Sequence, residues 1–562
     1  MANIAKKASE TLKEAIIEAI EKAKSTGQLI EAETPDFIIE VPADKKNGDL
    51  ATNVAMVCAK AFRTAPRNIA QAITENLSLE NTYVNRFEIA GPGFINFFLS
   101  SRYYADVITA VEEEGEDYGK SDFGNGKRIL LEFVSANPTG PMHIGNARGG
   151  ALGDCLASVL QTAGYDVDRE FYVNDAGNQI EKFKTSLEVR YLQIYDSSVE
   201  MPEDAYQGAD ITAHATAFNE IYGDKYLNTS SEERKQALCD YALPINIANL
   251  KKDLQKYRIE YDNWFLESSL HNSGAVADII EKLKESGHTY EQDGALWFKT
   301  TDFGDDKDRV LLRANGVPTY LVPDIAYHYN KLVTRNYDVA IDILGADHHG
   351  YIPRIKASME ALGVNPDKLD IIIMQMVRLI KDGDVYKLSK RSGKAVTLNT
   401  LIEEVPVDAA RFIFNMREPN TQMDFDIDLA VAEDSQNPVY YVQYAHARIC
   451  SIIKSLENDG VKARKCTAEE LALLTATEEK ELISHIASYT NEVISASNDY
   501  DPTKVTRYVL QLASLFHKFY NACRVKGDDE ALTQARLNLC IATKIVIKNV
   551  LTMLKINAPE SM

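Results

Sequence analysis

The chain has 562 residues, too many for a single hydrophobic core, and this length predicts about three or four domains. A hydrophobic content of 45% and a charged content of 26% are typical of globular proteins, and no apolar run is long enough to cross a bilayer. The net charge of −22 disfavours RNA binding by the whole surface, but basic and acidic residues nearly balance after Glu433, which allows a local RNA-binding face.

Residues 1–116 are predicted to form a small α+β domain. A charged amphipathic helix leads this segment, and its acidic residues make a signal or transit peptide unexpected. Strand-like alternation follows near Phe37, and a further helical stretch follows Asn53. The segment closes on two strand-like runs joined by a turn at Gly91 and Gly93.

After a charged linker, residues 117–430 are predicted to form a doubly wound α/β domain. The run R-I-L-L-E-F-V from Arg128 is a short apolar segment of the buried-strand type. Helical and strand-like segments then alternate, as they do around a parallel sheet. A polar, acidic stretch with a helical pattern interrupts this alternation from about residue 185, and we place an insertion around residues 185–300.

Residues 431–562 are predicted to form an all-α helix bundle, because the pattern is helical throughout. In the segment 503–523 the apolar residues fall on one helical face. They are Val505, Tyr508, Val509, Leu512, Phe516 and Phe519.

One motif predicts phosphate binding. The segment E-F-V-S-A-N-P-T-G-P-M-H-I-G-N, starting at Glu132, runs from an apolar strand through a Pro/Gly turn into a helix of small residues. The start of such a helix favours phosphate, and Gly145 lets a nucleotide approach the backbone. His143 can donate hydrogen bonds to an α-phosphate in the transition state. A lone histidine here would more often be a turn residue, but its flanks favour the phosphate-binding interpretation.

A second motif, K-L-S-K-R-S-G, begins at Lys387 after a strand-like run and a tight K-D-G-D turn. In most sequences such a basic segment is a solvated loop. Lysine is also a flexible point charge that can follow a pyrophosphate as it leaves. The position of the motif favours a loop that closes on the same phosphates from the other side.

Together, in this order and spacing, the motifs resemble the His-Ile-Gly-His and Lys-Met-Ser-Lys-Ser signatures of class I aminoacyl-tRNA synthetases. Their flanks resemble those of bacterial-type arginyl-tRNA synthetases. The chain departs at Asn146, which replaces the last histidine of the first signature and cannot become a cation. The resemblance implies a Rossmann-type catalytic domain that activates arginine with ATP to arginyl-adenylate and transfers it to the 3′ end of tRNA-Arg, releasing AMP and pyrophosphate.

The resemblance also implies the residues of the nucleotide site. Catalysis is assigned to His143, Asn146, Lys387 and Lys390. ATP binding is assigned to Pro138, Gly140, His143, Gly145, Asn146, Asp347, His349, Lys387, Ser389 and Lys390, with Mg²⁺ bound to ATP and no dedicated metal site. Asp347 and His349 belong to G-A-D-H-H-G, where adjacent histidines suggest a metal but no third ligand lies at a familiar spacing.

A selective pocket for arginine needs carboxylates directed at the guanidinium, which is planar and always charged. Tyr320 and Asp324 are four residues apart and share a face if the segment is helical, with Pro323 marking the helix start. Any single carboxylate is more often part of a surface ion pair. The resemblance assigns the side chain of arginine to Glu267, Tyr320 and Asp324, and its α-amino and carboxylate groups to Glu132, Ser135 and Asn137.

Tyr441, Tyr444 and Arg448 lie three and four residues apart, which places two aromatic rings and a guanidinium on one helical face. Such a face can stack unpaired bases, although an aromatic stripe is more often part of a core. The resemblance makes this the entry helix of an anticodon-binding domain, with Met562 near the anticodon. It further implies that residues 1–116 touch the outer corner of tRNA-Arg and that the protein is a monomer.

Three alternatives remain open. Another class I synthetase would share both signatures, but an enzyme for cysteine or methionine would not need Glu267 with Asp324. A non-catalytic tRNA-binding paralogue should have lost His143 or the lysines, and a small-molecule nucleotidyltransferase would lack the helical C-terminal part. Seven scattered cysteines without a C-x-x-C pair argue against disulfides and structural zinc and favour a reducing cytoplasm.

Overall fold

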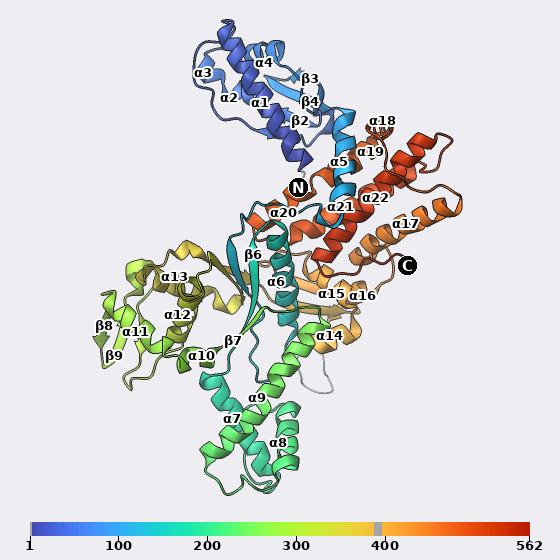
Figure 1. Cartoon of the computed structure of the whole chain (residues 1–562). Coiled ribbons are helices and arrows are strands. Elements are labelled where there is room, and N and C mark those ends of the chain that lie inside the picture. Colours follow the sequence, from blue (N-terminus) through green and yellow to red (C-terminus); the bar gives the residue numbers. More distant parts are fainter. Residues whose placement is uncertain (1–2, 387–395) are drawn as a thin grey trace.

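The structure is a computed structural model that describes residues 3–386 and 396–562. Figure 1 shows three parts in chain order, an N-terminal domain in blue, a central α/β domain and a C-terminal helix bundle in orange and red. This architecture confirms the predicted fold class. Within the described ranges, none of the helices has the length and apolar character that crossing a membrane requires.

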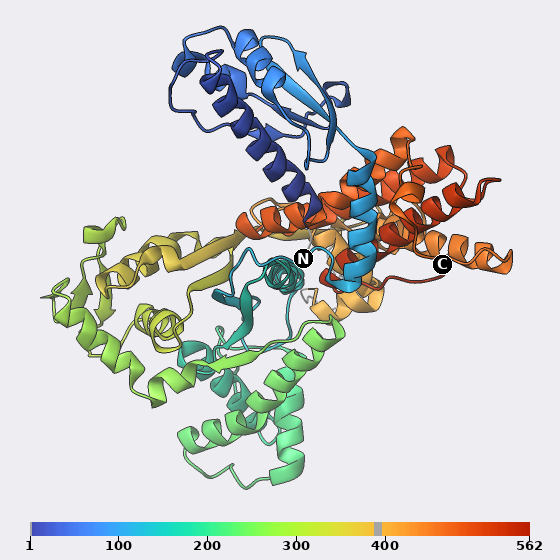
Figure 2. The same cartoon turned by 45° about the horizontal axis from the view of Figure 1, so that its top comes forward.

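The N-terminal domain contains an antiparallel sheet with the strand order β1-β2-β4-β3. Apolar positions of its first and fourth helices, including Leu12, Ile16 and Ile73, are buried with Phe97 in one core. Its α-helices and strands are α1 (Ile4–Ser25), β1 (Ile39–Glu40), β2 (Leu50–Thr52), α2 (Val54–Val57), α3 (Ala59–Phe62), α4 (Pro66–Asn76), β3 (Val84–Ala90) and β4 (Phe94–Leu99). The next helix, α5 (Ser101–Glu114), packs on the C-terminal bundle, so the domain stands off from the α/β domain (Figure 2).

The central domain is built on a parallel sheet with the strand order β12-β11-β5-β6-β7. Its strands are β5 (Arg128–Glu132), β6 (Asp166–Val173), β7 (Asn263–Leu266), β11 (Val339–Gly345) and β12 (Leu369–Met374). The chain continues from β5 to β6 and β7 on one side and returns to β11 and β12 on the other. The order therefore reverses between β5 and β11, and ligands of doubly wound proteins bind at the carboxyl ends of strands at such a reversal.

Two inserted segments flank β7, so the stretch around residues 185–300 includes one strand of the parallel sheet. Before β7, a helical arm extends downward in Figure 1, formed by α7 (Gly177–Gln193), α8 (Ala209–Tyr222) and α9 (Ser231–Lys256). After β7, a lobe contains a small antiparallel sheet with the order β10-β9-β8. The lobe comprises α10 (Glu267–Asn272), α11 (Ala275–Glu285), β8 (Thr289–Gln292), β9 (Ala295–Phe298), β10 (Arg309–Leu312) and α12 (Leu321–Tyr329).

A short connecting part joins the α/β domain to the bundle. The strand β11 is followed by the 3-10 helix η5 (Ala346–Tyr351) and by α13 (Ile352–Ala361). The connecting part contains a small sheet with the order β14-β13-β15. The remaining elements of this part are β13 (Val377–Lys381), β14 (Asp384–Val385), α14 (Leu398–Glu404), α15 (Val407–Phe414), β15 (Met423–Asp426) and α16 (Ile427–Val431).

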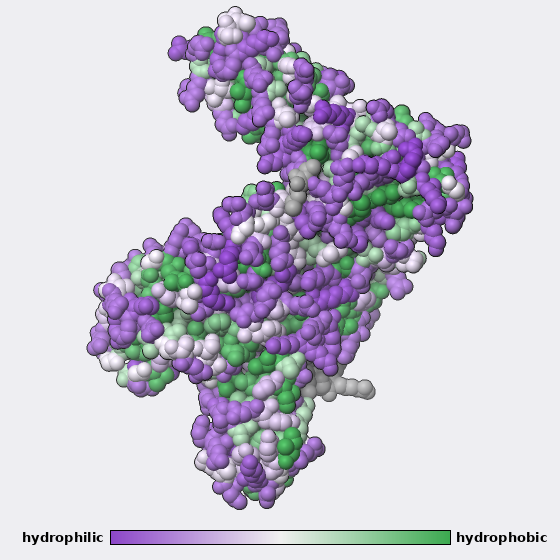
Figure 3. All heavy atoms as spheres, viewed as in Figure 1, coloured by the Kyte–Doolittle hydropathy of each residue, from purple (hydrophilic) through white to green (hydrophobic). Residues whose placement is uncertain are grey.

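The C-terminal bundle is all helical, as predicted. Its helices are α17 (Pro438–Asn458), α18 (Ala468–Leu471), α19 (Thr477–Ala487), α20 (Tyr489–Asn498), α21 (Thr503–Ala522) and α22 (Glu530–Met553). All six apolar residues predicted for one face of the segment 503–523 are buried in α21, which packs against α17, α19, α20 and α22. The face of the molecule shown in Figure 3 is mostly hydrophilic and is hollowed between the N-terminal domain and the α/β domain.

Candidate active site and RNA-binding groove

The loop after β5 begins with strained backbone at the sheet reversal. Val134 and Ser135 are consecutive residues with positive φ, at +71° and +41°. A β-branched residue in this region is an outlier that costs about 1–3 kcal/mol and persists only when its surroundings hold it. Here the Ser135 hydroxyl donates to Glu132 Oε1 at 2.8 Å and accepts from the Tyr172 N–H at 3.1 Å. These hydrogen bonds therefore hold the strained loop and fix Ser135 beside Glu132 at the carboxyl end of β5.

The first signature sits at the start of the helix α6 (Ile144–Thr162), with His143 as its N-cap residue. Asn146 Oδ1 accepts a hydrogen bond from the His143 backbone N–H at 3.0 Å. Asn146 thus uses its oxygen within the turn, and its NH₂ group is the part that can donate to a ligand. Apart from its chain neighbours and the backbone of its own helix, no atom of the described residues lies within 4 Å of the position that a Cβ on Gly145 would occupy, so a ligand can approach the backbone there.

The first signature also pairs with the segment that follows the lysine-rich motif. The Ile144 N–H donates to the Val396 carbonyl at 3.0 Å, and the Leu398 N–H donates to the Met142 carbonyl at 2.9 Å. Lys387, Ser389 and Lys390 themselves lie outside the described residues. The described chain resumes at Val396, and residues 396–398 are paired with the first signature beside His143.

A cavity of about 480 Å³ opens beside the signature turn. On one side the loop after β5 lines it, with Ser135, Asn137, Gly140, His143 and Asn146 among the lining residues. On the other side the wall is formed by the segment 206–211 at the start of α8, which belongs to the helical arm. Pro138 is buried and does not line the cavity, whereas His143 is exposed and lines it. The arrangement can hold a phosphate chain at a helix N-terminus.

Three carboxylates meet at the carboxyl ends of the strands. Glu132 ends β5, Glu267 begins α10 directly after β7, and Asp324 lies in the first turn of α12. All three act electrostatically on the Tyr172 hydroxyl of β6, which hydrogen-bonds Glu267. Burial and these carboxylates raise the pKa of Tyr172, so it is a neutral donor.

The negative charge of this pocket is only partly balanced by fixed cations. Lys331 is fully buried and binds Glu132 at 2.5 Å and Asp342 at 2.7 Å. Across the described ranges, neither Glu267 nor Asp324 forms an ion pair with a lysine or arginine, and the histidine nearest Glu267 is His271 at 3.7 Å. The pocket therefore carries an excess of negative charge, which favours a cationic ligand.

The pKa values reflect this imbalance. Burial raises the pKa of Asp324 to about 7, and the charges of Glu267 and Glu132 act in the same direction. His328 and a hydrogen bond from Tyr351 oppose the shift only in part. Burial also raises the pKa of Glu267. A bound cation would reverse these shifts, so the pocket is electrostatically prepared for one.

Some predicted residues lie outside this cluster. Tyr320 is the N-cap of α12 and is 57% exposed, with its ring beside Gly177 rather than among the carboxylates. Asp347 and His349 follow β11 in η5 and are exposed, at the sheet reversal but not in the cavity beside His143. His349 instead lines a separate cavity that extends from β12 to α20 and α21.

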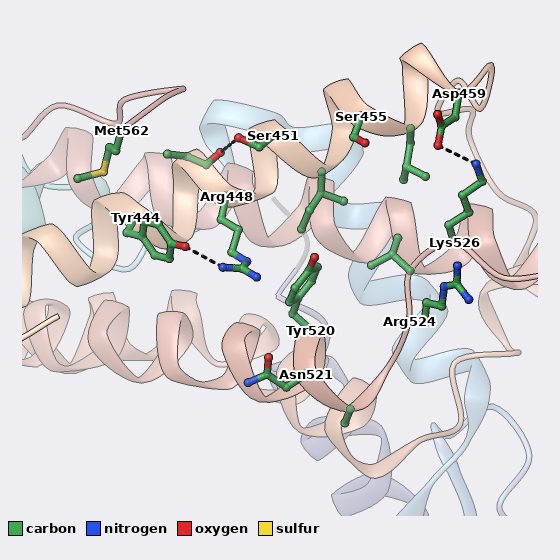
Figure 4. Close-up of a pocket in the computed structure, with 15 residues that line it drawn as sticks. Tyr444, Arg448, Ser451, Ser455, Asp459, Tyr520, Asn521, Arg524, Lys526 and Met562 are labelled. Atoms are coloured by element: carbon green, nitrogen blue, oxygen red, sulfur yellow. Dashed lines mark hydrogen bonds and ion pairs between the residues drawn. The ribbon is translucent and has the colours of Figure 1, made fainter. Parts of the chain in front are cut away.

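A groove of about 800 Å³ lies between α17 and the end of α21 (Figure 4). It is lined by Tyr444, Arg448 and Met562, three of the residues that the sequence analysis assigned to tRNA binding. Arg448 Nη1 donates to the Tyr444 hydroxyl at 2.7 Å, and its guanidinium carbon lies 4.5 Å from the Tyr520 ring centre. Tyr441 is turned away from the groove and contacts His517, with ring centres 5.1 Å apart.

Several residues of these sites were not predicted from the sequence. In the groove they are Tyr520, Asn521, Arg524 and Lys526, and in the carboxylate pocket they are Tyr172, His328, Lys331, Asp342 and Tyr351. The lysine at 331 carried no motif, and its contact with Glu132 spans 199 positions of the chain. For the groove residues of α21 a local signal was present, since basic and aromatic residues interleave near the end of this helix.

Comparison with known proteins agrees with this architecture. Three family descriptions match consecutive regions, the arginyl tRNA synthetase N terminal domain over residues 10–99, the catalytic domain of class I (R) tRNA synthetases over 108–451, and the DALR anticodon binding domain over 442–562. The arginine–tRNA ligases of Caldanaerobacter subterraneus subsp. tengcongensis and Ruminiclostridium cellulolyticum are 53% and 52% identical, each with 100% of both chains covered. The solved structure of the Thermus thermophilus arginyl-tRNA synthetase has the same fold, with a TM-score of 0.74 at 22% identity over 98% of this chain and 100% of that chain.

The reversed parallel sheet, the signature turn and the matched catalytic domain together define a class I aminoacyl-tRNA synthetase. Within that class, the match extends over the entire chain at more than half identity. The chain belongs to the arginyl-tRNA synthetase family.

Proposed function

We propose that this arginine–tRNA ligase activates arginine with ATP and transfers the arginyl group to the 3′ end of tRNA-Arg. In the first step a carboxylate oxygen of arginine attacks the α-phosphorus, and the bond to the β-phosphate breaks to release pyrophosphate. In the second step a terminal ribose hydroxyl of the tRNA attacks the carbonyl carbon of the adenylate, and AMP leaves. No side chain forms a covalent bond, so the protein contributes position and charge.

The observation that carries the proposal is the uncompensated carboxylate pocket at the sheet reversal. Glu267 and Asp324 lie where the side chain of an amino acid would reach, and they lack lysine or arginine partners in the described residues. A guanidinium presents several donors in a plane and suits a pair of carboxylates. Glu132, Ser135 and Asn137 would bind the α-amino and carboxylate groups, since Ser135 and Asn137 line the phosphate cavity and Ser135 is hydrogen-bonded to Glu132 of the carboxylate pocket.

The phosphate cavity supports the assignment of ATP. His143 would donate to the α-phosphate, with Gly145 allowing close approach and the start of α6 favouring negative charge. Asn146 would donate from its NH₂ group, because its oxygen is used by the turn. Lys387, Ser389 and Lys390 would reach the β- and γ-phosphates from the loop that ends beside His143. Mg²⁺ would enter with ATP and neutralise part of the phosphate charge.

The groove between α17 and α21 supports recognition of an anticodon. Tyr444 and Arg448 present an aromatic ring and a guanidinium, and Arg524 adds positive charge, whereas Lys526 is paired with Asp459 at 2.7 Å. Unpaired bases stack on such side chains, and phosphates bind such cations. The hollow between the N-terminal domain and the α/β domain offers a surface that the body of the tRNA can occupy (Figure 3). We propose further that the protein acts as a monomer in the cytoplasm.

The test is ATP–pyrophosphate exchange with each of the standard amino acids, in the presence and absence of tRNA-Arg. Of the amino acids tested, we expect arginine and no other to support exchange, and we expect this exchange to require tRNA-Arg. Equally efficient exchange with another amino acid would refute the arginine assignment. Absence of exchange with every amino acid, by a folded protein that still binds tRNA-Arg, would favour a non-catalytic tRNA-binding role.

A further inference from the structure

The helical arm is hydrogen-bonded to the loop that carries the first signature. Asn246 of α9 is 7% exposed, and its Nδ2 donates to the carbonyl oxygen of Pro138 at 2.9 Å. The oxygen of the same amide is held by His214 Nε2 of α8 at 2.7 Å. A chain of hydrogen bonds therefore runs from α8 through α9 to the loop just before His143.

This contact is distinctive for the loop. Among the described residues, it is the one hydrogen bond that reaches the segment 136–141 from any other part of the chain. On the other side, Met142 and Ile144 are held by Val396 and Leu398. The signature turn is thus fixed at its end by the segment after the lysine-rich motif and at its middle by the arm.

The local sequence indicates that Asn246 is specified at this position. Asparagine is a weak helix former, and a buried amide is costly unless its hydrogen bonds are made. Asn246 nevertheless lies inside a 26-residue helix, two positions after Pro244, which cannot donate the usual helical hydrogen bond. Both its nitrogen and its oxygen have partners, which offsets the cost of burial.

The arm also shares the wall of the cavity in which the nucleotide would bind. Gly208, Asp210 and Ile211 line it opposite the signature loop. Asp210 Oδ2 lies 3.7 Å from the position that a Cβ on Gly140 would take, so the two walls are in contact range. A displacement of the arm would therefore change both the shape of the cavity and the support of Pro138.

We propose that Asn246, held by His214, is a positioning residue that fixes the signature turn for ATP. The inference rests on the proposed function, in which His143 binds the α-phosphate. Without the amide, the buried Pro138 carbonyl loses its partner and the segment 136–141 loses its hydrogen bond to the arm. A displacement of His143 by about 1 Å is enough to reduce the rate of a positioned reaction strongly.

The test is a double-mutant cycle in ATP–pyrophosphate exchange with arginine and tRNA-Arg, using Asn246→Ala, His143→Ala and the double variant. We expect Asn246→Ala to lower kcat/KM for ATP about tenfold and to leave the KM for arginine within about twofold. In the His143→Ala background, the same substitution should lower kcat/KM by about twofold or less, because the residue acts through His143. A merely structural role would give the same fold loss in both backgrounds.

Gln236→Ala is the matched control, since it removes an exposed hydrogen bond of the same helix, to Asp240 at 2.7 Å, and should leave exchange unchanged. If Asn246→Ala does not fold, His214→Ala takes its place in the cycle and should give a smaller loss in the same direction. Parental kinetics of the folded variant, or equal losses in both backgrounds, would overturn the inference. A parent protein without exchange activity would instead refute the proposed function.

Discussion

At Asp324 the structure places a carboxyl group among like charges. Burial raises its pKa to about 7, and Glu267 and Glu132 contribute to the shift. Such a group is about half protonated near neutral pH, and a guanidinium placed beside it would favour the ionised form. Arginine binding and proton release from this residue are therefore expected to be coupled.

This coupling predicts that arginine binds more weakly as the pH falls through 7. The bound cation requires the ionised carboxylate, so the dissociation constant for arginine should rise by about tenfold between pH 8 and pH 6. Calorimetric titrations in two buffers of different ionisation enthalpy would report the constant and the proton released. Asp324→Asn is the control, because its binding should be weak and far less dependent on pH. An unchanged constant in the parent protein would contradict the assignment of Asp324.

At the scale of elements, the first signature is paired with the segment that follows the lysine-rich motif in the chain, through Met142 and Ile144 with Leu398 and Val396. We propose that this pairing brings the lysine-rich motif to the start of α6. The lysines can then act on charge that develops on the leaving pyrophosphate, which arises mainly in the transition state. Their contribution should appear in the rate of activation and hardly in the binding of arginine.

Accordingly, Lys390→Ala should slow adenylate formation by about ten- to a hundredfold while the affinity for arginine changes little. Single-turnover measurement of adenylate with tRNA-Arg present separates the rate from binding. Lys356→Ala, on α13 and not among the residues that line the cavity beside His143, provides a control that should behave like the parent. A raised KM for arginine with an intact kcat would show that the loop assignment is wrong.

Two tyrosines of the helix α17, Tyr441 and Tyr444, lie within one turn but differ in their relation to the groove. Tyr444 and Arg448 face the groove with Met562, whereas Tyr441 does not line it, although both tyrosine rings contact His517. We expect Tyr444→Ala or Arg448→Ala to weaken tRNA-Arg binding by about 1–3 kcal/mol through lost stacking or base contact. Filter binding of tRNA-Arg, compared with ATP and arginine binding measured without tRNA, tests this. Unchanged tRNA affinity together with a collapsed melting temperature would identify the two residues as core residues.

Across the whole molecule, one buried arginine joins three distant parts. The Arg411 guanidinium on α15 binds Asp154 of α6, donates to the Tyr257 carbonyl at the end of α9 at 3.0 Å, and donates to the Leu554 carbonyl after α22 at 2.8 Å. The signature helix, the arm and the bundle therefore share one fully buried ion pair. Removing Arg411 would leave the buried Asp154 with Arg169 alone, at 3.0 Å, and would leave the Tyr257 and Leu554 carbonyls without this donor.

We therefore expect Arg411→Ala to destabilise the protein by about 3–5 kcal/mol, far more than loss of an exposed pair. Urea unfolding followed by tryptophan fluorescence would measure the change. Arg378→Ala is the matched control, since it removes an exposed pair with Asp424 at 2.7 Å and should cost less than about 1 kcal/mol. Equal effects of the two substitutions would contradict the role of Arg411 as a structural junction.

The parts of the fold that depend on local pattern could be predicted from the sequence. The apolar face of α21 follows from helical periodicity, and the turn before His143 follows from Pro, Gly and the small residues of α6. The contacts of Lys331 with Glu132 and of Asn246 with Pro138 could not, because they join segments far apart in the chain and neither residue carries a local signal. Tyr441 and Tyr444 show the limit of periodicity, since both rings contact His517 but, of the two, Tyr444 alone lines the groove.

The measurement that tests the central claim most directly compares arginine with citrulline in adenylate formation by the parent and by Asp324→Asn. Citrulline is a neutral isostere, so its urea group does not need the carboxylate. Loss of one partner of a desolvated charge pair costs about 2–5 kcal/mol, so arginine use should fall at least about tenfold, while citrulline gains relative to arginine and ATP affinity is nearly unchanged. A preference for arginine as strong as in the parent would remove Asp324 from the pocket and leave Glu267 as its charged residue for the guanidinium.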